Sequence, residues 1–489
     1  MTIPDPAVEQ SRLVLTPHPL QRVGAFALVA LAGRECLGEF SAEDLLPAMD
    51  VVRADAVRAS VRESKAADGF WQKVSLSYFP NAPMNHPGRR KGKGPSGEPK
   101  TDGDVEEGVR SWLRIPASDS WPDAGCALCG RAAVGFFGKR DMALAESEAY
   151  RNTAPRGHDG TALCWPCLCG FYALPYGCQL TGGPSIALHS WDDGFLAASV
   201  RRRVERNLKI ALNGSAPKPS GWTREVVALR ALRNYGERLT DGVELLVFNN
   251  NNRGQLLERH GLDQPLAEWL RKTCRFGGLR VGFTALVRAH ATVNTSGVVS
   301  LARNAFRNPE RIVGRGTGFM ASSLLASEPE HAELTAVAEL IFSFAHEVLL
   351  MNEKDRSEIR ETAKRIAAVL HPEASRGPLK AFRKHLSNSR QLRSWLLSRD
   401  VALVGREETP FEGPLVSEHV MVLLFDPSQD NPWWFHRDLL LAGVVEELAR
   451  LKWTAKDESE TAEAEIAKLR EDDKKWINRE NDDDEEDER

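Results

Sequence analysis

The sequence predicts an α+β fold: a mixed N-terminal domain with an inserted four-cysteine module, followed by a C-terminal helical bundle. Three observations support this prediction. Two C-x-x-C pairs lie in the first half of the chain, and short apolar runs of strand character alternate with helical segments after them. From about residue 328, apolar residues recur at the three-four spacing of amphipathic helices. A chain of 489 residues has room for two or three domains.

The N-terminal α/β part, residues 1–120, mixes helical and extended signals. Residues 21–63 have a helical period, within which Ser41-Ala-Glu-Asp resembles a capping box. Residues 71–79 alternate apolar with polar side chains, which predicts a strand. The five prolines and five glycines of residues 80–103 then predict a loop, and this loop is basic.

Six of the eight cysteines fall within residues 126–178. Four of these form two C-x-x-C pairs with 34 residues between the pairs, namely Cys126, Cys129, Cys164 and Cys167. Two such pairs present four thiolates to one tetrahedral zinc ion. Disulfides are disfavoured because nothing indicates secretion, and a redox C-x-x-C needs one pair beside a βαβ pattern. Residues 121–182 therefore form a predicted zinc-finger module, in which Cys169 and Cys178 pack as small apolar groups or serve as spare ligands.

The zinc ion is expected to be structural, because four thiolates leave no place for an activated water. His158 and Asp159, between glycines in the intervening loop, raise the alternative of an HNH-like or HD-type site. An HNH site needs a second histidine and an asparagine at set spacing, whereas here one histidine follows Asn152. We therefore interpret His158 as a polar loop residue and predict no catalytic residue and no enzyme activity.

Composition describes an ordinary soluble protein, with 42% hydrophobic and 27% charged residues. The first ten residues contain neither a basic nor an apolar leader region, and the longest uncharged apolar run is too short to span a bilayer. We therefore expect a cytoplasmic protein with reduced thiols and no membrane partner.

The net charge of -4 conceals a strong asymmetry along the chain. Residues 201–320 contain 21 Lys and Arg against 9 Asp and Glu, a net charge of +12. A basic region of this size suits a polyanionic partner, although a solvated charged face is the alternative. Residues 471–489 contain 11 acids against 4 bases, a net charge of -7, and are predicted to be a disordered tail that repels nucleic acid.

Residues 183–325 are predicted to form a basic α/β part. Strands are expected at 185–191 and 243–248, and a basic helix at 195–212. The second strand ends in four asparagines, which favour a turn and also offer donors and acceptors to bases. The segment 303–316 combines arginine with asparagine and one phenylalanine, a composition suited to nucleic acid.

Residues 326–470 are predicted to form the helical bundle, because short connections separate helical patterns. These patterns occur at residues 334–348, 359–369, 382–396 and 439–451. Trp433 and Trp434 precede the last helix and are interpreted as core anchors rather than base-stacking platforms.

The order of these features resembles the large subunit of type I CRISPR-associated Cascade complexes, in the type I-A/I-B-like variety with a zinc-finger module. The resemblance is sharpest in CALCGRAA and DGTALCWPCLCGFYALPYGCQLTGG. It extends over most of the chain through GAFALVALAG, SAEDL, YFPN, LLVFNN and WFHRDLLLAGVVEELARL.

The resemblance implies a non-catalytic subunit of an RNA-guided DNA-surveillance complex. Its N-terminal part would recognise the protospacer-adjacent motif on target double-stranded DNA, and its helical bundle would lie along the opened strands of the R-loop. The implied partners are guide (CRISPR) RNA and the other Cascade subunits, those of the backbone and those that bind the 5′ handle of the guide. A separate helicase-nuclease, or a set of transposition proteins, would be recruited afterwards. Guide pairing would supply most of the sequence specificity.

The resemblance also assigns nucleic-acid contacts to particular residues. The loop that approaches the adjacent-motif duplex would contain Asn81, Asn85, Arg89, Arg90, Lys91 and Lys93. Short amides suit minor-groove acceptors, and the cations would hold phosphates. Further backbone contacts would come from Arg201, Arg202, Arg203, Arg206, Lys209 and Arg253. Two alternatives stay open at this point: a zinc-dependent nuclease, and a zinc-stabilised protein-interaction scaffold.

Overall fold

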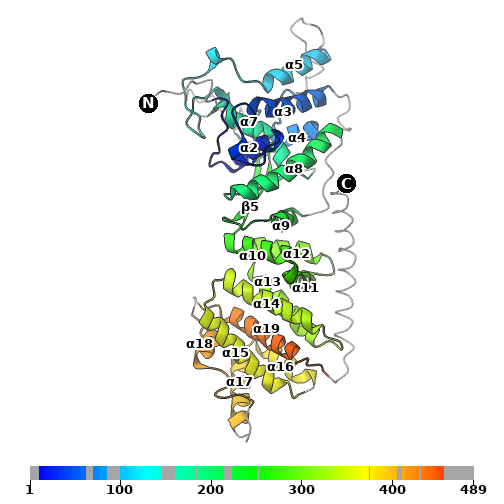
Figure 1. The fold of residues 1–489 in the computed structure, drawn as a ribbon, viewed down its shortest axis with the longest axis vertical. Helices are drawn as coiled ribbons and strands as arrows, with labels where there is room; N and C mark the ends of the chain where they lie inside the picture. The colour runs from blue at the N-terminus through cyan, green and yellow to red at the C-terminus, as the bar shows by residue number, and fades with distance from the viewer. Residues whose placement is uncertain are drawn as a thin grey trace. The chain divides into compact units, whose positions relative to one another are not determined.

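The structure is a computed structural model that describes residues 10–61, 70–84, 98, 100–145, 160–181, 184–213, 223–250, 254–373, 375–404, 410–428 and 431–455. The chain divides into two compact units (Figure 1). Unit 1 contains Met1–Arg224 and Glu237–Gly261, and unit 2 contains Glu225–Gly236 and Leu262–Arg489. Helices and strands are both present, a four-cysteine cluster lies in unit 1, and unit 2 is helical. The predicted α+β fold is therefore confirmed.

Unit 1 is organised around one buried helix. Its helices are α2 (Pro19–Leu31), α3 (Leu45–Ser60), α4 (Phe70–Tyr78), α5 (Asp102–Trp112), α7 (Trp165–Gly177) and α8 (Asp193–Asn213). All 13 residues of α7 are buried, as expected for a helix that is apolar on every side. Helix α2 crosses α7 with backbone against backbone, because a Cβ atom on Gly24 would lie 1.8 Å from the carbonyl oxygen of Gly170.

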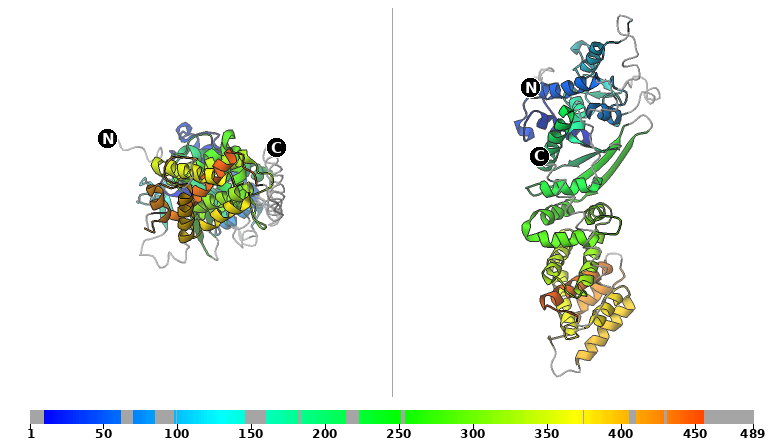
Figure 2. Two further views of the ribbon diagram at one scale, coloured as in Figure 1. Left: turned by 90° about the horizontal axis from the view of Figure 1, so that it is seen from below. Right: turned by 90° about the vertical axis from the view of Figure 1, so that its right-hand side faces the viewer.

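Two sheets complete unit 1, and the long strands of the larger one are visible in the right-hand view of Figure 2. The smaller sheet pairs β1 (Gly135–Phe137) with β2 (Thr161–Leu163). The larger sheet has the order β3 (Gln179–Leu180), β4 (Ser185–Ser190), β5 (Val243–Asn249) and β6 (Leu256–Leu262). Ser185 lies opposite Phe248 and Ser190 opposite Val243. The strands predicted at 185–191 and 243–248 and the helix predicted at 195–212 are confirmed.

The strand predicted at residues 71–79 is wrong, because this segment forms helix α4. Trp71, Val74 and Tyr78 are buried at the three-four spacing of one helical face, whereas Leu76 is 58% exposed. The alternation covers only Val74, Leu76 and Tyr78, whereas the helical spacing of buried residues extends over the whole segment from Trp71 to Tyr78. The helical pattern of residues 21–63 also divides, into α2 and α3.

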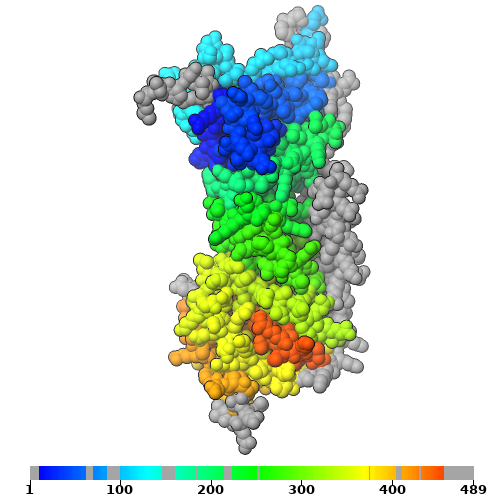
Figure 3. All heavy atoms as spheres, viewed as in Figure 1, coloured from blue at the N-terminus to red at the C-terminus, as the bar shows by residue number. Residues whose placement is uncertain are grey.

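Unit 2 is built from helices. They are α9 (Arg224–Asn234), α10 (Gln264–Arg275), α11 (Arg280–His290), α12 (Gly297–Arg307), α13 (Glu310–Leu324), α14 (His331–Glu347), α15 (Glu353–Leu370), α16 (Arg376–His385), α17 (Ser389–Val404), α18 (Glu418–Phe425) and α19 (Trp433–Arg450). Helices α13, α14 and α15 pack against α19, whose last turns, in orange-red, reach the surface in Figure 3. Helices α9–α13 thus belong with the bundle, although the sequence grouped them with the mixed basic part.

Two expectations about the bundle need correction. The helix predicted at 382–396 is two helices, α16 and α17, although its four apolar positions are all buried. Trp434 is 41% exposed, and Trp433 is half-buried with Arg437 stacked 4.3 Å from its ring, so the core anchor at this point is the buried Phe435. Among the described residues, no helix combines the length and apolarity needed to cross a membrane.

Candidate metal centre and cationic surfaces

The four predicted ligands meet in unit 1. The sulfur atoms of Cys126, Cys129, Cys164 and Cys167 all lie within 4.8 Å of one another, and the Sγ atoms of Cys129 and Cys164 are 3.4 Å apart. Tetrahedral bonds of about 2.3 Å from zinc to sulfur place sulfurs about 3.8 Å apart. Three of the cysteines are buried and Cys129 is half-buried. The cluster is therefore positioned to hold a metal ion with four protein ligands.

A tight backbone turn presents the first cysteine pair. The Gly130 N–H donates to the carbonyl oxygen of Cys126 at 2.8 Å, and the Cys126 N–H donates to that of Arg131 at 2.6 Å. Gly130 has φ +77, a conformation that glycine adopts without a Cβ penalty. The Ala127 N–H also donates to the carbonyl oxygen of Ala162 at 2.8 Å, which ties the turn to strand β2.

The second pair lies at the start of the core helix. Cys164 is the N-cap of α7 and Cys167 lies in its first turn, with Pro166 between them at a position where its missing N–H is not needed. The positive end of a helix dipole favours thiolates at this position. The four-cysteine cluster therefore connects the Cys126–Gly130 turn, which is hydrogen-bonded to β2, to the start of α7, the helix on which unit 1 is organised.

The thiols of Cys126, Cys164 and Cys167 change one another's pKa. A hydrogen bond with Cys126 raises the pKa of Cys164 and of Cys167, and burial raises both further. Hydrogen bonds from these two thiols lower the pKa of Cys126. Thiols this close share protons, and a dication that replaces the protons removes the repulsion between thiolates.

The remaining cysteines of the module lie outside the cluster. Cys169 and Cys178 are both 0% exposed, and burial raises the pKa of Cys178 to about 12. They pack as apolar groups in the core cluster of unit 1. His158 and Asn152, on which the HNH alternative depended, lie outside the described residues.

Most of the predicted adjacent-motif loop also lies outside the described residues, and so does Arg253. The loop residues concerned are Asn85, Arg89, Arg90, Lys91 and Lys93. Asn81 is exposed in the turn after α4. Of the asparagines after β5, Asn250 is buried and donates its amide to the carbonyl oxygen of Tyr78 at 2.7 Å. This hydrogen bond connects the end of β5 to the end of α4.

Helix α8 carries the other predicted contacts, which do not all lie on one face. Arg202, Arg206 and Lys209 are exposed and follow the i, i+4, i+7 spacing of one stripe. Arg201 pairs with Glu35 at 2.7 Å, and Arg203 donates to the side-chain oxygen of Gln179 at 2.8 Å. The structure therefore brings three of the five predicted α8 cations together on one exposed stripe.

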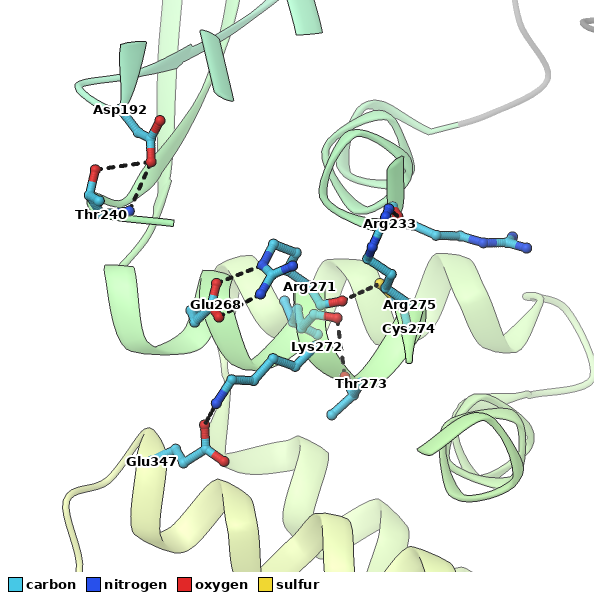
Figure 4. Close-up of polar contacts among 11 residues, drawn as sticks. Asp192, Arg233, Thr240, Glu268, Arg271, Lys272, Thr273, Cys274, Arg275 and Glu347 are labelled. Atoms are coloured by element: carbon cyan, nitrogen blue, oxygen red, sulfur yellow. Dashed lines mark hydrogen bonds and ion pairs between the residues drawn. The ribbon is translucent and has the colours of Figure 1, made fainter. Parts of the chain in front are cut away.

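Several cations of the basic middle are engaged inside unit 2 (Figure 4). On α10, Arg271 donates to Glu268 at 2.7 and 2.8 Å, and both side chains are buried. Lys272 bridges to Glu347 at 2.8 Å, and Arg275 donates to the carbonyl oxygen of Arg233 at 3.4 Å. These contacts stabilise the helical packing and leave those cations less available to a partner. In unit 1, Figure 4 shows Asp192 accepting two hydrogen bonds from Thr240.

The segment predicted at 303–316 spans α12 and α13. Arg303, Arg311 and Arg315 are exposed, and in the described parts of the chain none of them pairs with a carboxylate. Arg307 has the same spacing but pairs with Glu225 at 3.2 Å. We call Arg303, Arg311 and Arg315 the α12–α13 arginines. They are cations of unit 2 with no internal partner for their charge among the residues described.

A further cationic element was not predicted from the sequence. Residues 376–399 contain seven Lys and Arg and no Asp or Glu. They form the pair α16 and α17. The absence of acids over these residues is visible in the sequence, but their apolar spacing predicted only a buried helical face.

No protein-family model matches the chain, and no curated protein sequence matches it.

Proposed function

We propose that this protein is the non-catalytic large subunit of an RNA-guided DNA-surveillance complex of the Cascade type, with zinc at the four-cysteine cluster. It would recognise the protospacer-adjacent motif, stabilise the R-loop and then recruit a separate nuclease or transposition machinery. Cys126, Cys129, Cys164 and Cys167 would hold the zinc ion. When bound, the ion would supply four metal–sulfur bonds that fasten the Cys126–Gly130 turn to α7.

The observation that carries the nucleic-acid part of the proposal is the set of α12–α13 arginines. Exposed guanidinium groups that have no carboxylate partner within the protein are well suited to bind phosphates, often through two parallel hydrogen bonds. The stripe of Arg202, Arg206 and Lys209 on α8 supplies a second cationic surface, in unit 1. The sequence resemblance supplies the type of complex.

The closed cluster argues against a nuclease that activates its water at these four cysteines. Metal-assisted hydrolysis needs an open position for water on the ion, and four thiolates fill a tetrahedral sphere. The interaction-scaffold alternative differs in its prediction for phosphate contacts. A scaffold would bind duplex DNA negligibly even at low salt, where such contacts are strongest.

The test is recovery of the bound RNA. The full chain, tagged and expressed in its native host, is purified, and its RNA is sequenced. We expect short RNAs that share a constant repeat-derived end and differ in the remainder. A variant with Arg303, Arg311 and Arg315 changed to Ala serves as a matched comparison and is expected to show weaker binding to added DNA. Recovery of no RNA above an untagged control would contradict the proposal.

A further inference from the structure

We propose that the acidic segment, residues 471–489, docks on the basic face of α16 and α17 in the same chain and excludes polyanions from it. The docking itself is independent of the proposed function. Only the competition with nucleic acid depends on it.

The basic face consists of five cations. Of the seven Lys and Arg in residues 376–399, Arg376 is buried and donates to the carbonyl oxygen of Leu325 at 2.7 Å, and Arg399 pairs with Glu373 at 2.8 Å. The others are exposed, and none has a carboxylate partner among the described residues. We use the name basic face for these five exposed cations of two successive helices, namely Lys380, Arg383, Lys384, Arg390 and Arg393.

Packing holds these cations in place on two helices. Phe382 of α16 and Trp395 of α17 lie with ring centroids 4.9 Å apart, and Leu379, Leu392 and Leu396 are buried. On α16, Lys380, Arg383 and Lys384 lie at i, i+3 and i+4, which places them on one side of the helix. Arg383 also donates to the hydroxyl of Ser322 on α13 at 3.0 Å. The cations therefore project from a folded scaffold.

The described chain ends next to this face. The indole N–H of Trp453, close behind α19, donates to the carbonyl oxygen of Glu373 at 3.4 Å. Glu373 lies three residues before Arg376, the first residue of α16. His331 donates from Nε2 to the Trp453 carbonyl oxygen at 3.0 Å, which fixes the exit point. The described chain therefore ends beside the start of α16.

Chain length allows the acidic segment to reach the face. A coil of the 27 residues from 456 to 482 has an end-to-end distance of about 30 Å and an extended limit of about 90 Å. Both ends of the contact belong to unit 2, so the reach depends on one compact body.

Charge complementarity identifies the occupant. Residues 482–488 are seven consecutive acids, and residues 471–489 have a net charge of -7. The basic face has no acid on its own two helices between residues 376 and 399. A run of carboxylates presents the basic face with closely spaced negative charges, as a phosphate backbone does. Because residues 471–489 belong to the same chain, their effective concentration at the face is in the range of about 1 mM. Nucleic acid must then displace residues 471–489 before the nucleic acid can bind the basic face.

The direct test is zero-length carbodiimide cross-linking of the full chain, read by peptide mass spectrometry. We expect Lys380 and Lys384 to be joined to carboxylates of residues 471–489 at about 50 mM NaCl, and this yield to fall at least about fivefold at 500 mM. Lys354 and Lys364, on α15 of the same unit, are the matched controls and should give few such links. Links that are equally frequent at all four lysines overturn the proposal.

Isotope mixing separates docking within one chain from docking between copies. Equal amounts of ¹⁴N- and ¹⁵N-labelled chain are cross-linked together. Links in which both peptides carry the same label support the proposal. Links that mix labels at the random frequency assign the segment to a second copy and overturn it.

A binding arm tests the competition. A full-chain variant with D482N, D483N, D484N, E485Q, E486Q and D487N should bind single-stranded oligothymidylate about tenfold more tightly at low salt. The same changes combined with Lys380→Glu, Lys384→Glu and Arg390→Glu should give no such gain. An equal gain in both backgrounds would indicate general repulsion and overturn docking. If the expected cross-links form but no nucleic acid binds, docking is retained and the proposed function fails. If nucleic acid binds without those links, docking fails alone.

Discussion

Asp438, on α19, shows how one side chain can make stability depend on pH. Burial raises the pKa of its carboxyl to about 6, and the described residues provide no ion-pair partner for it. The ordinary value is 3.8, so between about pH 4 and 6 the folded state binds more protons than the unfolded state. The free energy of unfolding therefore falls as pH rises through this window.

The prediction is that Asp438→Asn raises the free energy of unfolding by about 2 kcal/mol at pH 7.5 and changes it little near pH 4. Urea unfolding at both pH values measures the difference. Glu328→Gln, at an exposed carboxylate between α13 and α14 of the same unit, is the control and should change the free energy of unfolding much less. A gain of equal size at both pH values would show that the carboxylate charge is not the cause.

At the scale of elements, the crossing of α2 and α7 requires a glycine. A methyl group at Gly24 would overlap the backbone of Gly170, so the helices would have to separate. We expect Gly24→Ala to lower the free energy of unfolding by at least about 3 kcal/mol. A Cβ atom added to Gly108 in α5 would meet no other atom, so Gly108→Ala should raise the free energy of unfolding by about 0.5–1 kcal/mol. Denaturant unfolding compares the two, and effects of the same sign would refute the argument.

Single substitutions can also test whether the four-cysteine cluster holds zinc. We expect one zinc ion per chain by elemental mass spectrometry, and zinc affinity at least about tenfold lower in Cys164→Ser. Cys36→Ser is the matched control, because Cys36 is exposed and outside the cluster. Chelation should lower the melting temperature of the parent chain. A chain purified without metal, at full stability, would exclude a structural ion.

At the scale of the whole molecule, the net charge of -4 hides cationic surfaces on an otherwise acidic protein. Binding to DNA should weaken as salt rises, with a slope set by the number of phosphates contacted. We expect Arg311→Ala and Arg315→Ala each to reduce the magnitude of that slope by about 1. Arg307→Ala, which removes a cation already paired with Glu225, should change it less. Slopes from fluorescence anisotropy that do not differ among the three variants would exclude the α12–α13 arginines as phosphate contacts.

Spacing along the chain was enough to predict the four-cysteine cluster, the strands at 185–191 and 243–248 and the helix at 195–212, because these depend on local patterns of residues. Cys126, Cys129, Cys164 and Cys167 meet as the two C-x-x-C pairs predicted. Tertiary structure alone decided that residues 70–78 are helical, since burial of Trp71, Val74 and Tyr78 against unit 1 outweighs local alternation. It also decided which arginines face an internal carboxylate, because ion pairs such as Arg307 with Glu225 join residues 82 positions apart. Composition counts charges, whereas only packing determines which of them remain exposed.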